Sequence, residues 1–307
     1  MLKRSLTFWF DWIAGAQFAG LYWARDFGLY EAAGLDVTLE PWQDDGLSLF
    51  EKVARGAAAG EFSAGCAEDN LIVNHVANGG SMMAFGSMLQ DTPLVIMSKQ
   101  DQAIRSIGEL RGKRIGMHTD GIRALQIVLA LEGISVADLD LQEVGFDLEH
   151  LRSGRFDGLQ GYVMTEPVQL GTVGFDVHVL PIKHHRLHPY SQVYFAEQTL
   201  LQRHGALYAD FLAASSAGWR AACSDPVAAS ELLAKNTGGQ STQAEQRLML
   251  DRVGELVNHQ AVQRIAGTGA EQWQRNLQSY VDFGLTDRKI DFQEVVFDLP
   301  KSPTPHS

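Results

Sequence analysis

Asp11 and Trp12 are the first side chains in the sequence whose chemistry suits the binding of a small planar molecule. An indole face stacks on a ring, and a carboxylate accepts hydrogen bonds from ring or exocyclic N–H groups. The pair closes an apolar segment, residues 6–12, that is typical of a strand buried on both faces of a sheet. The alternative is that Trp12 belongs to the core and Asp11 caps a turn. We expect the pair to contact a ligand.

Further candidate ligand-binding residues follow other expected strands. Ligands of open α/β sheets bind outside the carboxyl ends of the strands. The candidates at such positions are Cys66, Glu68, Thr119, Asp120, Tyr162 and Glu166. The alternative for the polar ones is a role as a helix cap or as an acid near a helix N-terminus. Acids facing the cleft disfavour an anionic ligand, so the sequence predicts a planar ligand that is uncharged or weakly cationic.

The histidines His184, His185 and His188 raise the question of a metal site. His185 and His188 would share one face of a helix. However, Pro189 follows directly, and no carboxylate or cysteine nearby completes a ligand set. We therefore expect no metal at these histidines.

The sequence shows no pattern typical of a catalytic or cofactor-binding centre. Nucleotide-binding glycine loops, nucleophile elbows and zinc-protease motifs do not occur. The two cysteines, Cys66 and Cys223, lack the spacing of a zinc cluster. They could form one long-range disulfide, but we expect two small buried residues. We expect no cofactor and no catalytic residue, which favours a binding protein over an enzyme.

The composition limits the class of protein. The chain has 307 residues, 45% hydrophobic and 20% charged, enough to build a core in each of two lobes. Its formal net charge of −12 argues against nucleic acid as the main partner. No apolar run is long enough to span a membrane. The start, Met1-Leu-Lys-Arg, resembles a secretion signal without a cleavage site, so we expect either a cytoplasmic protein or a periplasmic one whose leader has been removed.

Strand-like and helix-like segments alternate along the chain, as in an α/β protein. The alternation breaks where residues 81–88 and 94–98, both strand-like, follow one another without a helix. Such a break is expected where the chain crosses into a second lobe, and residues 190–197 are expected to cross back. These crossings predict one lobe of residues 1–92 plus 190–307 and another of residues 93–189.

Several short motifs carry a resemblance to a known family. They are Asp11-Trp12, Gly20-Leu21-Tyr22-Trp23-Ala24, Phe27-Gly28-Leu29-Tyr30, Ala33-Gly34-Leu35-Asp36-Val37, Glu109-Leu110-Arg111-Gly112-Lys113-Arg114-Ile115-Gly116 and Glu166-Pro167. With them the chain resembles the thiamin-pyrimidine-type substrate-binding proteins of ABC transporters, a family that includes the yeast thiamin-pyrimidine synthase. The resemblance implies an α/β, periplasmic-binding-protein type II fold. In that fold two α/β lobes are joined by a double crossover hinge and enclose a ligand cleft.

The resemblance adds Phe18 and Tyr22 to the candidate ligand-binding residues. It also shows two departures. The pyrimidine-synthesising members carry an Asn and a His shortly after the Asp-Trp pair, where alignment places Gly15 and Phe18. The cysteine-rich, iron-associated motif of the yeast-type enzyme has no counterpart here. Both departures argue against synthase chemistry.

The expected function is that of a solute-binding receptor. It would capture a small planar heterocycle, a thiamin-precursor pyrimidine or a similar molecule, between its lobes and deliver it to the permease of an ABC importer. The alternatives are a cytoplasmic enzyme on the same fold, of the thiamin-pyrimidine synthase or menaquinone-pathway kind, and a ligand-sensing module of a signalling protein.

Overall fold

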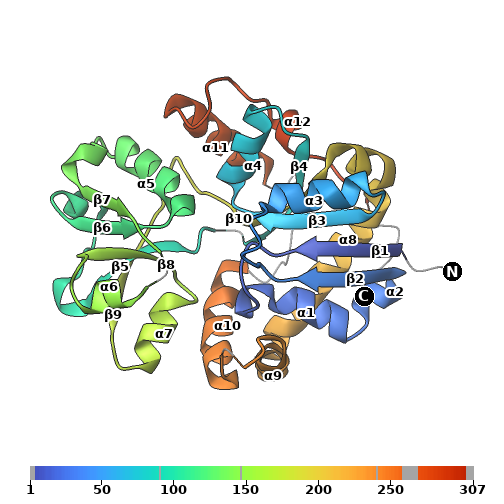
Figure 1. Cartoon of the computed structure of the whole chain (residues 1–307), viewed down its shortest axis with the longest axis horizontal. Helices are drawn as coiled ribbons and strands as arrows, with labels where there is room; N and C mark the ends of the chain where they lie inside the picture. Colours follow the sequence, from blue (N-terminus) through green and yellow to red (C-terminus); the bar gives the residue numbers. More distant parts are fainter. Residues whose placement is uncertain (1–3, 90, 146, 240, 258–268, 302–307) are drawn as a thin grey trace.

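The strands of the chain form two separate sheets of five strands each (Figure 1). The computed structural model describes residues 4–89, 91–145, 147–239, 241–257 and 269–301. The first sheet has the order β2-β1-β3-β10-β4, with β1 (Arg4–Trp9), β2 (Leu35–Glu40), β3 (Phe62–Ala67), β4 (Met82–Leu89) and β10 (Ser191–Glu197). The second has the order β7-β6-β8-β5-β9, with β5 (Leu94–Lys99), β6 (Arg114–Met117), β7 (Asp140–Glu143), β8 (Gly158–Tyr162) and β9 (Val177–Pro181).

Both sheets are mixed. In the first, β1 runs parallel to β2 and β3, and β10 runs antiparallel to β3 and β4. In the second, β6 runs parallel to β7 and β8, and β5 runs antiparallel to β8 and β9. The chain passes from the first sheet to the second between β4 and β5, and returns between β9 and β10. The predicted fold, two α/β lobes linked by a double crossover, is confirmed.

Helices flank each sheet. With the first sheet, which we call lobe 1, lie α1 (Ala19–Asp26), α2 (Leu29–Ala32), α3 (Leu49–Ala58), α4 (Asp69–Ala77), α8 (Gln198–Ser224), α9 (Pro226–Asn236), α10 (Gln243–Val257), α11 (Ala270–Asp282) and α12 (Phe292–Val295). With the second sheet, lobe 2, lie α5 (Thr119–Leu131), α6 (Glu149–Arg152) and α7 (Glu166–Thr172). Short 3₁₀ turns are η1 (Ala16–Phe18), η2 (Gln100–Gln102), η3 (Ile107–Leu110) and η4 (Val136–Asp138).

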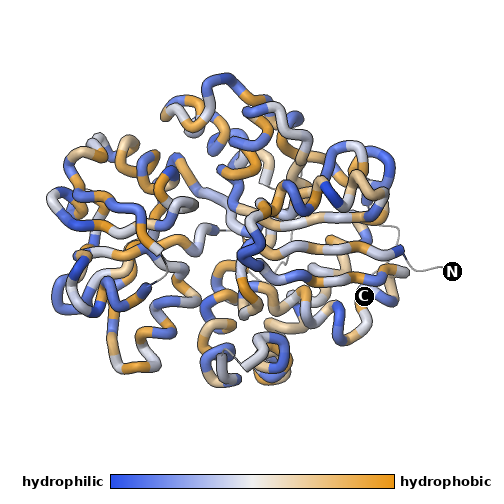
Figure 2. Tube along the Cα trace, viewed as in Figure 1, coloured by the Kyte–Doolittle hydropathy of each residue, from blue (hydrophilic) through white to orange (hydrophobic). Residues whose placement is uncertain are grey.

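The core of lobe 1 is rich in aromatic rings. Phe10 stacks on Phe18 with ring centroids 3.8 Å apart, and Phe8 contacts Tyr194 and Phe211. All five side chains are fully buried. In Figure 2 hydrophobic residues recur along the central strands of both sheets, whereas many outer loops are hydrophilic. A rigid aromatic core thus holds the end of β1 in place.

Some element boundaries differ from the predicted ones. The first strand ends at Trp9 rather than at residue 12, so Asp11 and Trp12 lie in the segment after it. The aromatic and small residues of the segment 16–33 predict a single helix, but the helix is divided, because Gly28 adopts φ of 75° between α1 and α2. The sequence also predicts a loop at residues 118–121, and this prediction is wrong, since α5 already begins at Thr119. The first and the third of these differences lie directly after strands, at the ends of β1 and β6.

Candidate functional site

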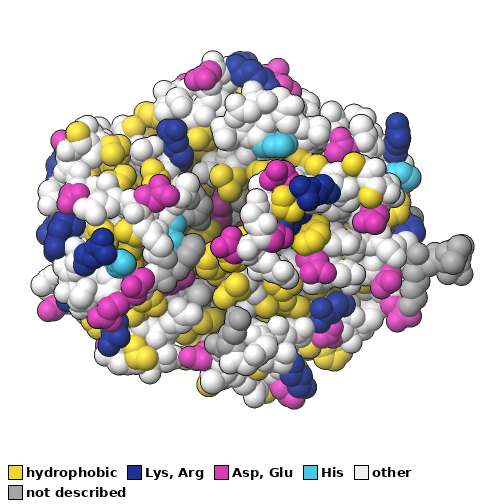
Figure 3. All heavy atoms as spheres, viewed as in Figure 1, with side chains coloured by type: hydrophobic (Ala, Val, Ile, Leu, Met, Phe, Trp, Pro, Cys, Tyr) yellow, Lys and Arg dark blue, Asp and Glu magenta, His cyan; other side chains and the backbone are white. Residues whose placement is uncertain are grey.

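A cavity of about 360 Å³ lies between the two lobes. Figure 3 shows the surface hollowed there, with acidic and hydrophobic side chains around the opening. The volume falls within the range of small-molecule sites. The lining residues come from both lobes: Asp11, Trp12, Trp42, Leu47, Ser48, Leu49, Ala67, Glu68 and Leu71 from lobe 1, and His118, Thr119, Val144, Gln160, Gly161, Tyr162, Thr165 and Glu166 from lobe 2.

Two indoles form the aromatic wall of the cavity. Trp12 follows β1 and Trp42 follows the neighbouring parallel strand β2, so both emerge at the same edge of the sheet. Their rings stack with centroids 5.8 Å apart and an angle of 24° between planes. The backbone N–H of Trp42 donates to the carbonyl oxygen of Trp12 over 3.0 Å. The pair offers a flat, fixed surface to a ring.

The carboxylate of Asp11 is held by lobe 1. Its Oδ1 accepts hydrogen bonds from the Cys66 thiol and from Nε2 of Gln192, each over 3.4 Å. Burial raises the pKa of the Cys66 thiol well above its usual value, and the negative charge of Asp11 raises it further. Cys66 therefore stays a neutral thiol, which anchors Asp11 and is a poor nucleophile.

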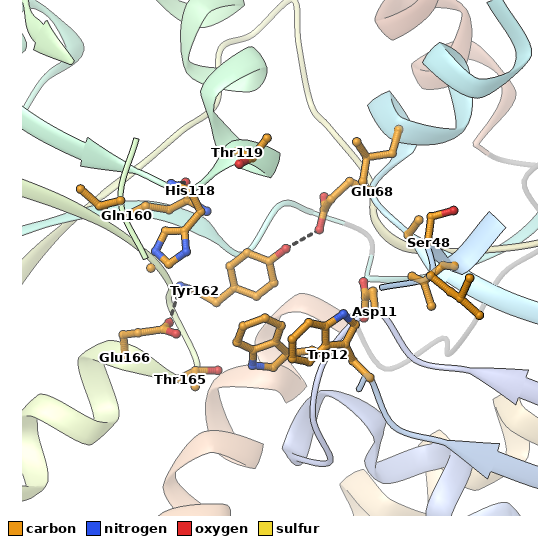
Figure 4. Close-up of a pocket in the computed structure, with 17 residues that line it drawn as sticks. Asp11, Trp12, Ser48, Glu68, His118, Thr119, Gln160, Tyr162, Thr165 and Glu166 are labelled. Atoms are coloured by element: carbon orange, nitrogen blue, oxygen red, sulfur yellow. Dashed lines mark hydrogen bonds between the residues drawn. The ribbon is translucent and has the colours of Figure 1, made fainter. Parts of the chain in front are cut away.

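Glu68 joins the lobes. It stands directly before α4, and its Oε2 accepts from the hydroxyl of Ser191 at the start of β10 over 2.6 Å. Its Oε1 accepts from the phenol of Tyr162, at the end of β8 in lobe 2, over 2.5 Å. Figure 4 shows this bond crossing the cavity above Trp12. One carboxylate thus ties lobe 1, the returning crossover and lobe 2 together.

The lobe 2 wall is built from buried polar side chains. Gln160 and His118 are almost fully buried, and Oε1 of Gln160 accepts from the backbone N–H of His118 over 2.9 Å. Gly121 permits this arrangement, because a Cβ there would lie 2.2 Å from Oε1 of Gln160. Glu166 accepts from the backbone N–H of Tyr162 over 2.7 Å. The wall is therefore set by packing and by internal hydrogen bonds.

The predicted site residues fall into three groups. Asp11, Trp12, Glu68, Thr119, Tyr162 and Glu166 line the cavity. Cys66 lies buried beneath Asp11, and Phe18 and Tyr22 are buried in the lobe 1 core. The side chain of Asp120 lies outside the described residues. The ligand-binding roles of all these residues stay predictions.

Sequence reasoning missed Trp42, His118 and Gln160 as lining residues. Trp42 carries a signal in the sequence, because a tryptophan followed by the polar residues 43–45 comes just after the strand-like run at residues 35–40. His118 directly follows β6, the position at which the other candidates were found. Gln160 lies inside β8, and no pattern in the sequence distinguishes it from a core residue.

The charge of the lining is one-sided. It includes the carboxylates of Asp11, Glu68 and Glu166, and among the described lining residues there is no lysine or arginine. Protein donors occupy part of each carboxylate. The cavity consequently favours neutral or cationic ligands over anions.

The histidine cluster and the cysteines lie away from the cavity or below its surface. The ring of His184 lies 3.9 Å from that of His185, and its Nδ1 accepts from the N–H of Arg186. Across residues 4–301, gaps excepted, no group of three or more potential ligands is placed to hold a metal ion. Cys66 and Cys223 are both free thiols. None of the described helices is long and apolar enough to cross a membrane.

The sequence of the chain matches a known family. The model of the family described as NMT1/THI5 like matches residues 15–229, more than half of the chain. The chain belongs to the NMT1/THI5-like family.

Two relatives of this NMT1/THI5-like chain have names that refer to different small molecules. The riboflavin-binding protein RibY of Chloroflexus aurantiacus is 27% identical over 58% of this chain and 51% of its own length. A putative thiamine biosynthesis protein of Haemophilus influenzae is 24% identical over 52% of this chain and 50% of its own. The matches thus span about half the length of each relative.

The fold has close counterparts among solved structures. The periplasmic aliphatic sulphonate-binding protein SsuA from Escherichia coli superimposes with a TM-score of 0.73 at 15% identity. The superposition covers 95% of this chain and 97% of SsuA. The NMT1/THI5-like chain therefore has the periplasmic-binding-protein fold, as its motifs predicted.

Proposed function

We propose that the protein is a solute-binding receptor that captures a small planar heterocycle between its lobes for an ABC-type importer. The observation that carries this proposal is the cavity between the lobes, with the stacked Trp12 and Trp42 on one side and acids around it. A ring stacked on an indole gains about 0.5–1.5 kcal/mol beyond the burial of its area. The carboxylates of Asp11 and Glu68 supply acceptors for N–H or O–H groups of the ligand.

The class of ligand follows from the lining charge. The name of SsuA states that it binds aliphatic sulphonates, whereas the described lining of this cavity holds acids and no lysine or arginine. A sulfonate would lie unpaired beside carboxylates, which is unfavourable. The names of two relatives point instead to riboflavin and to thiamine biosynthesis. Both support a neutral or weakly cationic flat heterocycle, such as a flavin or a thiamin-precursor pyrimidine.

Capture involves movement of the lobes. We place their limits at residues 1–92 plus 190–307 and at residues 93–189, because the crossings lie between β4 and β5 and between β9 and β10. Closure about such crossings buries the ligand and creates the form that a partner recognises. The proposed partner is an ABC permease. The proposed compartment is the periplasm or cell envelope, because SsuA, which has the same fold, is named a periplasmic protein.

Calorimetric titration tests the proposal. Riboflavin, the hydroxymethyl pyrimidine precursor of thiamin and an alkanesulfonate are titrated separately into the purified protein, and native mass spectrometry identifies any co-purified ligand. We expect a flat heterocycle to bind with micromolar or tighter affinity and the sulfonate not to bind. Binding of the sulfonate alone would contradict the proposed ligand class.

A further inference from the structure

A smaller cavity adjoins the main one on the lobe 2 side. Its volume is about 200 Å³. It shares Trp12, His118, Gln160 and Glu166 with the main cavity, so the two spaces adjoin along these side chains. It then continues past Asp147 and Gln169. This side cavity follows the carboxyl ends of β6, β7 and β8, where α/β proteins bind ligands.

The side chains at which the two cavities meet are held by burial and by hydrogen bonds. His118 and Gln160 are 8% and 3% exposed, and the hydrogen bond from the His118 backbone N–H to Gln160 fixes them together. Glu166 is fixed by the N–H of Tyr162. The side chains at the junction of the two cavities are therefore held in place, and a substituent of a ligand in the main cavity has a defined space beside them.

The polar groups of the side cavity are mainly acceptors. Asp147 and Glu166 contribute carboxylates, and Gln169 contributes an amide from the exposed face of α7. Oδ1 of Asp147 accepts from the N–H of Glu149 over 2.9 Å, which orients the carboxylate at the start of α6. Among the described residues around this cavity there is no lysine or arginine. Such a lining suits hydroxyl or ammonium groups and repels anions.

We propose that the side cavity is a second subsite, which binds a substituent rich in hydrogen-bond donors carried by the planar ligand. The ligand is then a two-part molecule: a flat ring against Trp12 and a neutral polyhydroxyl or an amine-bearing chain reaching Asp147 and Gln169. The inference rests on the proposed function and specifies its ligand further. The size supports it, because a water occupies about 30 Å³ and the added space exceeds that several times.

Matched flavins test the subsite. Riboflavin carries a ribityl chain, lumiflavin carries a methyl group in its place, and riboflavin 5′-phosphate adds a phosphate at the end of the chain. We expect riboflavin to bind on the order of 10-fold more tightly than lumiflavin, as one or two hydrogen bonds to charged acceptors would give. The phosphate should lower the affinity on the order of 10-fold relative to riboflavin, because it meets the carboxylates.

Substitutions in the side cavity test whether its residues cause these differences in affinity. The double variant Asp147→Asn, Gln169→Leu should bring the ratio of riboflavin to lumiflavin affinity close to one, and Asp147→Asn alone should reduce the phosphate penalty. The side-chain oxygen of asparagine can still accept the hydrogen bond from the N–H of Glu149, so folding is expected to persist. The control is Gln202→Leu, an exposed glutamine on α8 in lobe 1, which should keep the wild-type ratio.

The outcomes separate the two proposals. Suppose that lumiflavin binds, that its affinity falls in Trp12→Ala, and that riboflavin binds no more tightly than lumiflavin. The proposed subsite is then wrong, whereas the proposed function as a receptor is retained. If riboflavin still binds more tightly than lumiflavin in the double variant Asp147→Asn, Gln169→Leu, the proposed subsite is also wrong. If neither flavin binds and the thiamin-pathway pyrimidine does not bind either, the proposed ligand class fails and this inference fails with it.

Discussion

At the scale of single residues, the site depends on side chains that the protein itself orients. Asp11 is held by Cys66 and Gln192, and Glu68 by Ser191 and Tyr162. Preorganised acceptors bind a ligand without first having to be ordered. The buried residue Gln192 adopts φ of 51°, a left-handed backbone conformation that is strained for residues other than glycine. This backbone strain is the energetic cost of the arrangement.

Trp12 is the residue with the largest expected effect on binding. Replacing it by alanine removes the stacking surface and most of the apolar contact to a ring. We expect Trp12→Ala to weaken binding of the heterocycle by about 2–3 kcal/mol, or roughly 30–150-fold. Calorimetric titration measures this loss. Trp23→Ala, which removes an indole that stacks on Phe27 away from the cavity, should leave the affinity at the wild-type level. Equal affinities of Trp12→Ala and wild type would show that the ring lies elsewhere.

At the scale of elements, helix packing sets the frame of lobe 1. Helices α1 and α8 approach so closely that a Cβ on Gly20 would lie 2.2 Å from the ring of Trp219, which is fully buried. A Cβ on Gly218 would lie 2.1 Å from the carbonyl oxygen of Gly20. Both positions therefore require glycine, because a larger side chain would prevent α1 and α8 from packing so closely.

Gly20→Ala should destabilise the protein. The added methyl group overpacks the contact with Trp219, and overpacking costs about 1–3 kcal/mol. Denaturant-induced unfolding measures the change in the free energy of unfolding. The matched control is Gly254→Ala in α10, where a Cβ meets nothing within 4 Å. That variant should stabilise by about 0.5–1 kcal/mol, because alanine is the better helix former. A stable Gly20→Ala protein would argue against the close crossing.

A buried carboxylate links α4, α11 and the returning crossover. Asp69 accepts from the phenol of Tyr280 over 2.6 Å, from Nδ2 of Asn276 over 3.1 Å and from the N–H of Tyr190 over 3.1 Å. Burial raises its pKa from 3.8 to about 6, and the hydrogen bonds oppose this rise. Asp69 is thus a pH-dependent part of the joint between the lobes.

The stability of the protein should depend on pH through Asp69. Since the folded-state pKa lies above the unfolded value, the contribution of Asp69 is fully present below about pH 4 and is lost as the pH rises through about 6. The full change is on the order of 2–3 kcal/mol. Asp69→Asn should remove this part of the pH profile, measured by urea unfolding from pH 3.5 to 7. Asp101→Asn, at an exposed aspartate, should keep the wild-type slope. Identical slopes for Asp69→Asn and wild type would count against the raised pKa.

At the scale of the whole molecule, the lobes are joined by contacts beyond the two crossovers. Tyr162 donates to Glu68 across the cavity, and α10 of lobe 1 contacts α7 of lobe 2. A hydrophobic cluster also continues from lobe 1 residues such as Ile72 and Val193 to lobe 2 residues such as Ile96 and Ile115. The relative position of the lobes is therefore set by polar and apolar contacts as well as by the two crossovers.

Tyr162→Phe should loosen the contact between the lobes. The variant keeps the aromatic ring and removes the hydrogen bond to Glu68, which shifts the ligand-free protein toward open forms. We expect a larger radius of gyration in small-angle X-ray scattering without ligand, and about 10-fold weaker ligand binding, because fewer molecules are in the competent form. The control Tyr30→Phe loses a hydrogen bond to Ser215 within lobe 1 and should change stability without changing the radius. An unchanged radius and affinity for Tyr162→Phe would mean that the bond does not hold the lobes.

The sequence by itself determined the order of elements and the class of fold. The alternating run at residues 35–40 and the apolar run at residues 177–181 predict strands, and β2 and β9 lie there, because such runs are local signals. The two successive strands β4 and β5 revealed the first crossing for the same reason. Candidate acids after β3 and β8 could be found because parallel strands bring their carboxyl ends to one edge.

Only the tertiary structure decided which candidates meet. Phe18 and Tyr22 are buried in the core while Trp42 joins Trp12 at the cavity, and these outcomes depend on how β1 and β2 pair and on how α1 lies against α8. The bond from Tyr162 to Glu68 joins residues 94 positions apart, and Gln160 reaches the wall because Gly121 leaves room for it. Such contacts arise from the packing of distant segments, and a periodic pattern in one segment carries no information about them.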